Sequence, residues 1–561
     1  MDQPSSRRGF LEEVLRGGVA LPAALGHGRA QPDGRPIVCR VTDAGTRQGT
    51  AARIRLVNSR GEEIVPAGHP TALTETAQEG DVRFQKRRFA YVNGSFEIDP
   101  RWLPLRYQVI KGYEYTIAEG EITPAGVRGG SFTIPLKRWS APTRERWYSG
   151  DVHIHHISTK TCRLEMEAED LNVANILTSD FTVDQAEFEG KVNSNSGPGR
   201  LIYVNQEFRN HQLGHMCLLN LKRLIEPVKT VQPYHFPLHL DVCDRTHEQG
   251  GYVAWAHFPS WPGVESPLDV AMEKLDGLEI LSVLDPLDFP VFMKQVTNEQ
   301  EPNDGLHLWY RFLNCGFRLT ATAGTDKMTN YVTVGANRVY AQIEGEFSYQ
   351  AWIDALKAGN TFVSNSPLLK LTVNGHKPGA TVQVASRRSR VISIHATADS
   401  QLPFDRLEIV ANGEVIGETT PSRRPYHAEI HLEHPFKDSC WIAARAREDI
   451  GPYRKRGVAF QKIHVEEGTL HGNLYGTRRP ETVFAHSSPV YVIRDGQPVR
   501  SWEDAQYYVR YLDRAIQWLK TEAKFASRSD QQASIDAFLA GRAVYAKRAQ
   551  EARQRHSAQR I

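Results

Sequence analysis

The feature that most limits the possible folds is an alternation of short apolar runs with helical stretches over residues 147–366. The runs "ANILTSD", "RLIYVNQE", "YVAWAH", "GLEILSV" and "FRLTATAGTD" are apolar almost throughout, as strands buried on both faces are. Helical sequences such as "CRLEMEAEDLN", "SPLDVAMEKL", "NDGLHLWYRFLNCG" and "SYQAWIDALKAG" lie among them. The alternation predicts an α/β fold with a parallel sheet or a barrel.

Strand patterns are found on both sides of this region. Residues 36–138 predict a small antiparallel sandwich, and the Asn93-Gly94 pair within them is the strongest short signal for a hairpin. Residues 367–465 predict a second β-sandwich. The C-terminal segment, residues 481–561, is expected to carry a helical tail that begins at a capping box of Ser501 and Asp504. The apolar stripe that would dock this tail consists of Tyr508, Leu512, Ala515 and Leu519.

Length and composition narrow the class of protein. A chain of 561 residues is expected to form two to four domains. The net charge of +3 gives no global field for nucleic acid or a membrane surface. No run of 18 apolar residues occurs, so no stable membrane insertion is expected. The six cysteines lack a CxxC pair, and they are expected to be buried thiols.

Residues 1–30 have the features of a targeting segment. Arg7 and Arg8 precede Phe10 and Leu11, and a modestly apolar stretch then ends in small residues near Ala30. This arrangement resembles a bacterial twin-arginine signal, which predicts export to the periplasm in a folded state. The alternative is a disordered basic terminus, which Glu12 and Glu13 favour.

The stretch "YSGDVHIHH", residues 148–156, places unusual chemistry on a predicted strand. In a strand, alternate side chains point to the same face, so His153 and His155 lie side by side. Two neutral imidazoles in this arrangement can bind one cation. The alternative is a pair of inert histidines at a strand end.

Other predicted strands end in residue types that bind metals. Asp180, Glu207, His257 and Asp326 each close an apolar run, and His215 opens another. In barrels of parallel strands the carboxyl ends meet at one mouth, where active sites are built. Imidazoles with carboxylates and no thiolate favour Zn, Mn, Fe or Co over Ca or Mg. The sequence therefore predicts a transition-metal site at this mouth.

These motifs, in this order, resemble the polymerase-and-histidinol-phosphatase (PHP) superfamily. "NQEFRNHQLGHMCLLNL", "GGYVAWAHFPSWPG" and "AHSSPVYV" resemble its CehA/McbA branch of carbaryl-hydrolase-like metallohydrolases. The likeness covers about residues 90–495. It implies a PHP-like distorted (β/α) barrel, flanked by the two small β-sandwich regions and followed by the C-terminal helical tail.

The resemblance also implies a ligand set. One or two divalent transition metals (Zn, Mn or Fe) would be held, with Glu207 as the bridge in a dinuclear arrangement. Phe181 and Met328 stand where many members of the superfamily have histidine, which argues against a third metal. The implied metal ligands are His153, His155 and Asp326 on one side, and His215 and His257 on the other, with Glu207 between them.

Further polar residues near these motifs have possible supporting roles. Asp151 is expected to orient an imidazole through its second ring nitrogen. Asp180, His211 and His156 are the candidate catalytic acids that would assist a leaving group. For Asp180 a metal ligand, a supporting group and a helix cap are equally open, and His211 could equally be an exposed loop histidine.

The predicted chemistry is hydrolysis of an ester-like bond in a small molecule by metal-bound hydroxide. A carbamate or carboxylic ester is favoured, since Trp255, Phe258, Trp261 and Trp309 would suit an aryl group, although aromatic residues usually pack in the core. A phosphoesterase with the same metal site is the alternative, for which Arg209 and Lys327 would meet the phosphate charge, unless they point to solvent. A catalytically silent metal- or carbohydrate-binding protein is a third possibility. The oligomeric state stays open.

Overall fold

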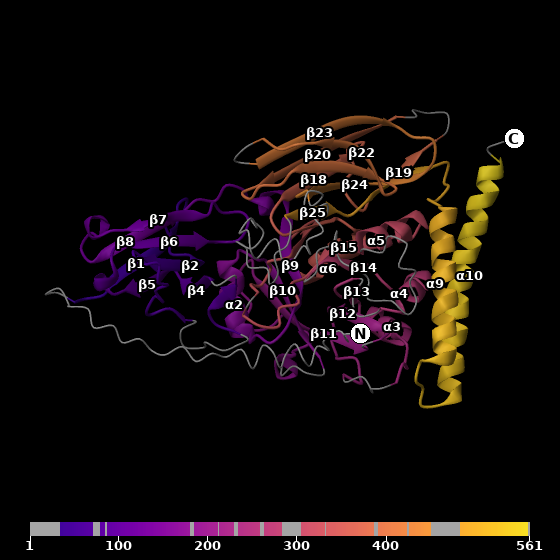
Figure 1. Ribbon diagram of the computed structural model, residues 1–561, viewed down its shortest axis with the longest axis horizontal. Coiled ribbons are helices and arrows are strands. Elements are labelled where there is room, and N and C mark those ends of the chain that lie inside the picture. Colours follow the sequence, from indigo (N-terminus) through magenta and orange to yellow (C-terminus); the bar gives the residue numbers. More distant parts are fainter. Residues whose placement is uncertain are drawn as a thin grey trace.

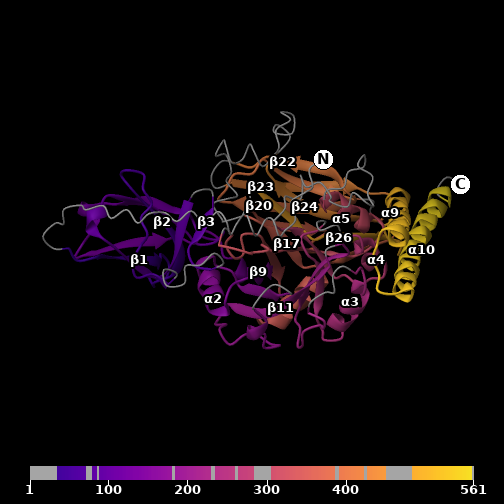
Figure 2. The same cartoon turned by 60° about the horizontal axis from the view of Figure 1, so that its bottom comes forward.

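The protein has a mixed α/β fold built on one strongly curled, half-barrel sheet (Figure 1). The computed structural model describes residues 34–70, 79–84, 87–179, 184–210, 212–228, 234–258, 263–282, 305–330, 332–385, 391–422, 426–449 and 483–558. The predicted export signal, residues 1–30, lies outside these ranges. Two small sheets at the N-terminal end lie on one side of the curled sheet, and the C-terminal helices lie on the other (Figures 1 and 2).

The large sheet has 13 strands along its main path. Two further strands, β19 (Thr381–Val384) and β26 (Val490–Arg494), branch from it at β24. In spatial order the path runs through β15 (Thr320–Ala323), β14 (Gly277–Leu281), β13 (Tyr252–Trp255), β12 (Gly214–Leu219), β11 (Leu201–Asn210), β10 (Val173–Thr178), β9 (Trp147–Ile154), β16 (Arg338–Gln342), β17 (Thr361–Ser364), β25 (Phe484–Ser487), β24 (Cys440–Arg447), β21 (Arg406–Ala411) and β22 (Glu414–Thr419).

The part of this sheet from β15 to β9 is mainly parallel, as the alternating pattern predicts. β9, β10 and β11 are parallel to one another, and so are β13, β14 and β15. β12 is antiparallel to both β11 and β13. The strands are buried on both faces, and every residue of β10 and β14 is buried, which explains their largely apolar sequences.

Short helices connect these strands. Four of them, α2 (Thr159–Ala168), α4 (Ser266–Ala271), α5 (Gly305–Asn314) and α6 (Tyr349–Ala358), overlap the predicted helical stretches, whereas α3 (His239–His247) was not predicted. α6 begins after Ser348, whose hydroxyl accepts from the backbone N–H of Ala351, and it ends at Gly359 in the left-handed conformation (φ 73°).

The N-terminal region consists of two packed sheets, and one detail of its prediction is wrong. The turn at Asn93-Gly94 joins no paired hairpin, because β4 ends at Asn93 in one sheet and β5 starts at Ser95 in the other. Gly94 (φ 77°) turns the chain, and its carbonyl accepts from the N–H of Val41. One sheet is β5 (Ser95–Ile98), β1 (Ile37–Asp43) and β8 (Ser131–Leu136), with β1 parallel to β8; the other, antiparallel, is β3 (Val82–Phe84), β4 (Arg87–Asn93), β2 (Ala51–Asn58), β6 (Leu105–Ile110) and β7 (Ala118–Ile122).

The C-terminal β region differs from the separate sandwich that its sequence predicts. β18 (Leu368–Val373), β20 (Val391–Ser400) and β23 (Tyr426–Pro435) form a three-stranded antiparallel sheet. The strands opposite it, β21, β22 and β24, continue the large sheet through β25 and β17. This region therefore shares a sheet with the half-barrel, a pairing between distant segments that local patterns do not encode.

The helical tail forms as the cap and stripe predict. α9 (Trp502–Thr521) starts at Ser501, whose side chain accepts from the N–H of Asp504, and the predicted stripe is buried. Tyr508 stacks on Phe312 of α5 with ring centroids 4.3 Å apart. α10 (Arg528–Ala558) packs along α9. None of the helices in the described ranges has the length and apolar character needed to cross a membrane.

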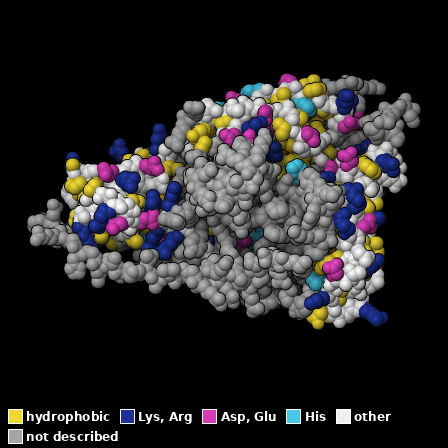
Figure 3. All heavy atoms as spheres, in the orientation of Figure 1, with side chains coloured by type: hydrophobic (Ala, Val, Ile, Leu, Met, Phe, Trp, Pro, Cys, Tyr) yellow, Lys and Arg dark blue, Asp and Glu magenta, His cyan; other side chains and the backbone are white. Residues whose placement is uncertain are grey.

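The six cysteines are buried and free, as expected. The surface carries mixed charge: on the coloured part of the face in Figure 3, basic and acidic side chains are interspersed. This distribution accords with the small net charge of the chain.

A buried ion pair ties the N-terminal sheets to the half-barrel. Arg53 of β2 donates from Nε to Glu169, just after α2, at 2.6 Å, and both side chains are almost fully buried. The hydroxyl of Tyr91 also donates to Glu169. Because both charges are out of water, loss of one partner leaves the other uncompensated.

We expect Arg53→Ala to lower the free energy of unfolding by about 3–5 kcal/mol, since Glu169 would then carry a buried, unpaired charge. Arg55→Ala is the matched control, because Arg55 lies on the same strand and its ion pair with Glu63 is partly exposed (28% for each side chain). This variant should lose less than about 1 kcal/mol of unfolding free energy. Urea unfolding measures both variants, and equal losses would contradict the role of the buried pair.

Candidate metal centre

The curled sheet brings all six predicted metal ligands into one buried group. His153 lies on β9 with His155 directly after it, Glu207 lies on β11, and His257 and Asp326 follow β13 and β15. His215 joins them because β12 runs antiparallel, so that its first residues lie beside the end of β11. The members of the group are His153, His155, Glu207, His215, His257 and Asp326, all of them buried.

One half of the group contains the H-x-H pair. The Nε2 atoms of His153 and His155 are 3.0 Å apart, which confirms that the two rings share a face. Asp326 Oδ1 lies 3.6 Å from the first of these nitrogens and 3.8 Å from the second. Three potential ligand atoms therefore surround one small volume.

The other half is assembled around Glu207. Its Oε1 atom lies 3.1 Å from His215 Nδ1 and 3.6 Å from His257 Nε2. Its Oε2 atom lies 3.1 Å from His155 Nε2, which belongs to the first half. The Glu207 carboxylate thus stands between the two halves, where a bridging ligand would stand.

The hydrogen bonds of the first two rings indicate where their lone pairs point. Nδ1 of His155 donates to the carbonyl of Leu177 at 2.6 Å, because a carbonyl can only accept. Nδ1 of His153 lies 3.2 Å from the Glu279 carboxylate and donates in the same way. In the neutral rings both Nε2 atoms then carry lone pairs that face each other. A cation between them would turn this repulsion into attraction, so the residues fit a metal ion.

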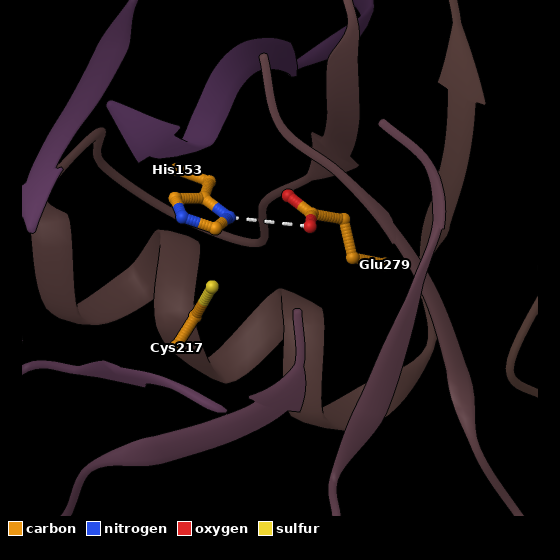
Figure 4. A group of neighbouring side chains, drawn as sticks. All are labelled: His153, Cys217 and Glu279. Atoms are coloured by element: carbon orange, nitrogen blue, oxygen red, sulfur yellow. Dashed lines mark hydrogen bonds and ion pairs between the residues drawn. The ribbon is translucent and has the colours of Figure 1, made fainter. Parts of the chain in front are cut away.

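Glu279, on β14, is a functional residue that the sequence analysis missed. Figure 4 shows its carboxylate directed at the His153 ring, with the Cys217 thiol on another side of that ring. The same carboxylate accepts from the backbone N–H of His257. The available signal was a carboxylate inside the otherwise apolar run 277–283. Gly324 permits this approach, since a Cβ there would collide with Glu279 and His153.

Asp151 has a different role from the predicted one. Among the described residues it has no hydrogen bond to an imidazole ring. Its carboxylate accepts from the backbone N–H groups of His153, Thr325 and Gly335, and from the Thr325 hydroxyl. Burial raises its pKa to about 6, against the opposing effect of these hydrogen bonds. Asp151 therefore fixes the backbone that carries His153 and Asp326.

Electrostatics keep Glu207 and His215 in the protonation states that bind metals. Burial acts to raise the pKa of Glu207, but Arg209 and the neighbouring histidines outweigh it and hold that pKa well below its usual range. Burial, assisted by Arg209, lowers the pKa of His215 well below its usual value. A charged carboxylate and a neutral imidazole are the forms that bind metals.

The backbone is strained where two of these residues sit. His257 and Asp326 have φ values of 35° and 43°, a conformation that non-glycine residues rarely adopt. Strain of this kind persists only where the surrounding structure enforces it, and it is concentrated at functional sites. Here it turns both side chains into the group directly after their strands end.

Of the three candidate acids, the structure describes only His156. It is half-buried, with φ 53°, and its ring centroid lies 6.2 Å from that of His155. Asp180 and His211 lie outside the described residues. The catalytic roles of all three remain predictions.

The residues that were expected to contact the substrate differ in their surroundings. Lys327 is buried and donates from Nζ to the carbonyl of Val332 at 2.7 Å, so its charge is used within the fold. Arg209 is buried on the same face of β11 as Glu207, and its Nε lies 3.6 Å from that carboxylate. Trp255 and Trp309 pack in the hydrophobic core, and Trp261 lies outside the described residues.

Comparisons with known proteins assign no family to this chain. No family model matches it, and no curated protein matches it. Among solved structures, the crystal structure of PsfC from Pseudomonas syringae PB-5123 is similar over 37% of this chain and 88% of its own, at 16% identity and a TM-score of 0.26. This likeness is distant and partial, so the resemblance to the PHP superfamily stays a prediction.

We expect Glu279→Gln to weaken metal binding by about 10–100-fold, because a neutral amide no longer fixes the donor state of the His153 ring. Competition against a chromogenic chelator measures the affinity. Cys217→Ser is the matched control on the same ring, and it should leave the affinity within about twofold. If Cys217→Ser weakened metal binding and Glu279→Gln did not, the thiol and not the carboxylate would orient the His153 ring.

Proposed function

We propose that the protein is a metal-dependent hydrolase that cleaves an ester-like bond in a small molecule. The observation that carries this proposal is the buried group of four imidazoles and two carboxylates, with Glu207 between its halves. Such a group is costly to bury without a cation. The motifs that resemble the CehA/McbA branch of the PHP superfamily support the same chemistry.

The proposed cofactor is one or two divalent transition metals, Zn, Mn or Fe. His153, His155 and Asp326 would hold one ion, His215 and His257 a second, and Glu207 would contact both. When bound, such ions lower the pKa of a coordinated water and polarise the oxygen of the bond under attack.

The remaining described residues organise this centre. Glu279 and the Leu177 carbonyl hold the His153 and His155 rings in the tautomer that presents Nε2. Arg209 adds a positive charge beside Glu207. We propose Asp180, His211 and His156 as candidates to protonate the leaving group.

The ester class depends on which side chains meet the substrate. Carbamates and carboxylic esters are favoured by the branch resemblance, but the described tryptophans Trp255 and Trp309 pack in the core and supply no aryl pocket. Arg209, buried beside Glu207, is the specific observation that favours a phosphoester, since guanidinium groups pair with phosphate oxygens. We therefore propose phosphoester hydrolysis as a second candidate function.

Export through a twin-arginine signal is also a proposal, supported by Arg7 and Arg8. The buried free thiols are compatible with folding and metal loading before export.

The central test is metal content together with turnover. The purified protein should contain one or two equivalents of transition metal in this group, and His155→Ala and His257→Ala should each reduce turnover by at least about 100-fold. His376→Ala is the control, since this histidine is exposed between β18 and β19 and belongs to none of the groups of potential metal ligands among the described residues. Substrates to compare are p-nitrophenyl acetate, an aryl methylcarbamate and bis-p-nitrophenyl phosphate. A protein that binds metal or carbohydrate but leaves all three intact would support the silent binding protein instead.

A second variant separates the ester classes. Arg209→Gln should lower kcat/KM for bis-p-nitrophenyl phosphate by about 10–100-fold, the loss expected for a charge-assisted hydrogen bond, while the uncharged esters change little. Arg209→Lys keeps the charge and should retain part of the phosphodiester activity. An equal loss of kcat/KM for every substrate would indicate that Arg209 acts by holding Glu207 in place and does not contact the phosphate.

A further inference from the structure

A second group of potential metal ligands lies on the opposite face of the same strands. It consists of His239, the first residue of α3, Glu265, which directly precedes α4, and Asp269 within α4. It shares no residue with the centre described above. All three side chains are fully buried.

Ring contacts place this group behind the sheet. His239 lies edge-on to Phe208 and to Trp255, with centroid distances of 5.6 Å and 5.9 Å. Phe208 directly follows Glu207 on β11, so the two side chains point to opposite faces. Glu207 faces the first metal centre, and His239 therefore lies on the outer face, beneath α3 and α4.

The three ligand-bearing atoms are close enough to share one ion. One atom from each of His239, Glu265 and Asp269 can be chosen so that all three lie within 4.8 Å of one another. His239 Nδ1 is 3.3 Å from Glu265 Oε2. The other oxygen, Oε1, accepts from the backbone N–H of His239 at 2.7 Å, which holds Glu265 in place at the start of α3.

The polar atoms that face this space lack partners outside the group. Among the residues that the structure describes, no hydrogen-bond partner beyond these three side chains is found for either oxygen of Asp269, for Glu265 Oε2 or for either ring nitrogen of His239. Within those ranges no Lys or Arg forms an ion pair with either carboxylate. Two buried carboxylates without a compensating charge are strongly unfavourable. A positive charge from outside the chain is therefore required, or a proton.

We propose that His239, Glu265 and Asp269 form a separate binding site for a divalent transition metal. One imidazole and two carboxylates suit Zn, Mn or Fe better than Ca or Mg, which prefer oxygen ligands alone. Because its ligands come from α3 and α4, the ion clamps these two helices onto the outer face of β12 and β13. Tyr545 of α10 closes over α4 by donating to the Pro267 carbonyl, which completes the burial.

The competing explanation is a shared proton. Burial raises the pKa of Glu265 to about 8 and raises that of Asp269 well above its ordinary value, so one proton held between the carboxylates would also reduce the charge. The two explanations predict different amounts of bound metal, and they predict different effects of Asp269→Asn.

Anomalous X-ray scattering from crystals of the full chain grown with Zn²⁺ provides the first test. At the zinc edge, a peak is expected about 2.0–2.2 Å from ligand atoms of His239, Glu265 and Asp269. Wild-type protein is used, so the result does not depend on how a variant folds. If the peak is absent while His153 and His257 show one, the proposal is overturned and the hydrolase proposal stands.

Metal analysis of variants provides the second test. Asp269→Asn should lose one equivalent of bound Zn²⁺ but keep the equivalents of the first centre, whereas His155→Ala should do the opposite. The melting temperature of Asp269→Asn should no longer rise when Zn²⁺ is added to chelator-treated protein. Unchanged metal content with unchanged or higher stability would establish the shared proton, because an amide can replace a protonated carboxyl.

Discussion

The central feature of the half-barrel is the meeting of four imidazoles and two carboxylates in one buried space. The Nε2 atoms of His153 and His155 lie 3.0 Å apart. The Nδ1 atom of His153 is held by Glu279, and that of His155 by the Leu177 carbonyl. These outer hydrogen bonds determine which atoms point inward. When both rings are neutral, these inward lone pairs repel one another, and a bound cation would remove the repulsion.

The antiparallel strand β12 makes a complete ligand set possible. In a purely parallel sheet, only residues at strand ends reach the mouth. Because β12 runs the opposite way, His215 reaches the mouth from the start of its strand and lies 3.1 Å from Glu207 on the neighbouring β11. The strained backbone at His257 and Asp326 serves the same purpose after β13 and β15.

Local periodicity predicted several of the strands, the helices α2, α4, α5 and α6, and the candidate residues of the first centre, whereas the division of those candidates between two ions came from the resemblance to the PHP superfamily. Periodicity placed His153 and His155 on one face by parity, and it identified Glu207, His257 and Asp326 by their position in apolar runs. It failed for Glu279, because a single carboxylate in a buried run gives no indication of its partner. The shared sheet of β17, β25 and β24 and the turn at Gly94 were missed for a related reason. Both depend on pairing between strands that are distant in the sequence.

The contacts of Glu279 join the two halves of the centre mechanically. Its carboxylate contacts the His153 ring in one half and the backbone N–H of His257 in the other, and Gly324 leaves room for both contacts. A shift of either histidine therefore moves the carboxylate that positions the other. Occupancy of one half should then alter the geometry of its neighbour, so that two ions would bind with coupled rather than independent affinities. Glu279 lies outside the predicted ligand set, which is why the spacing of ligands in the sequence does not reveal this connection.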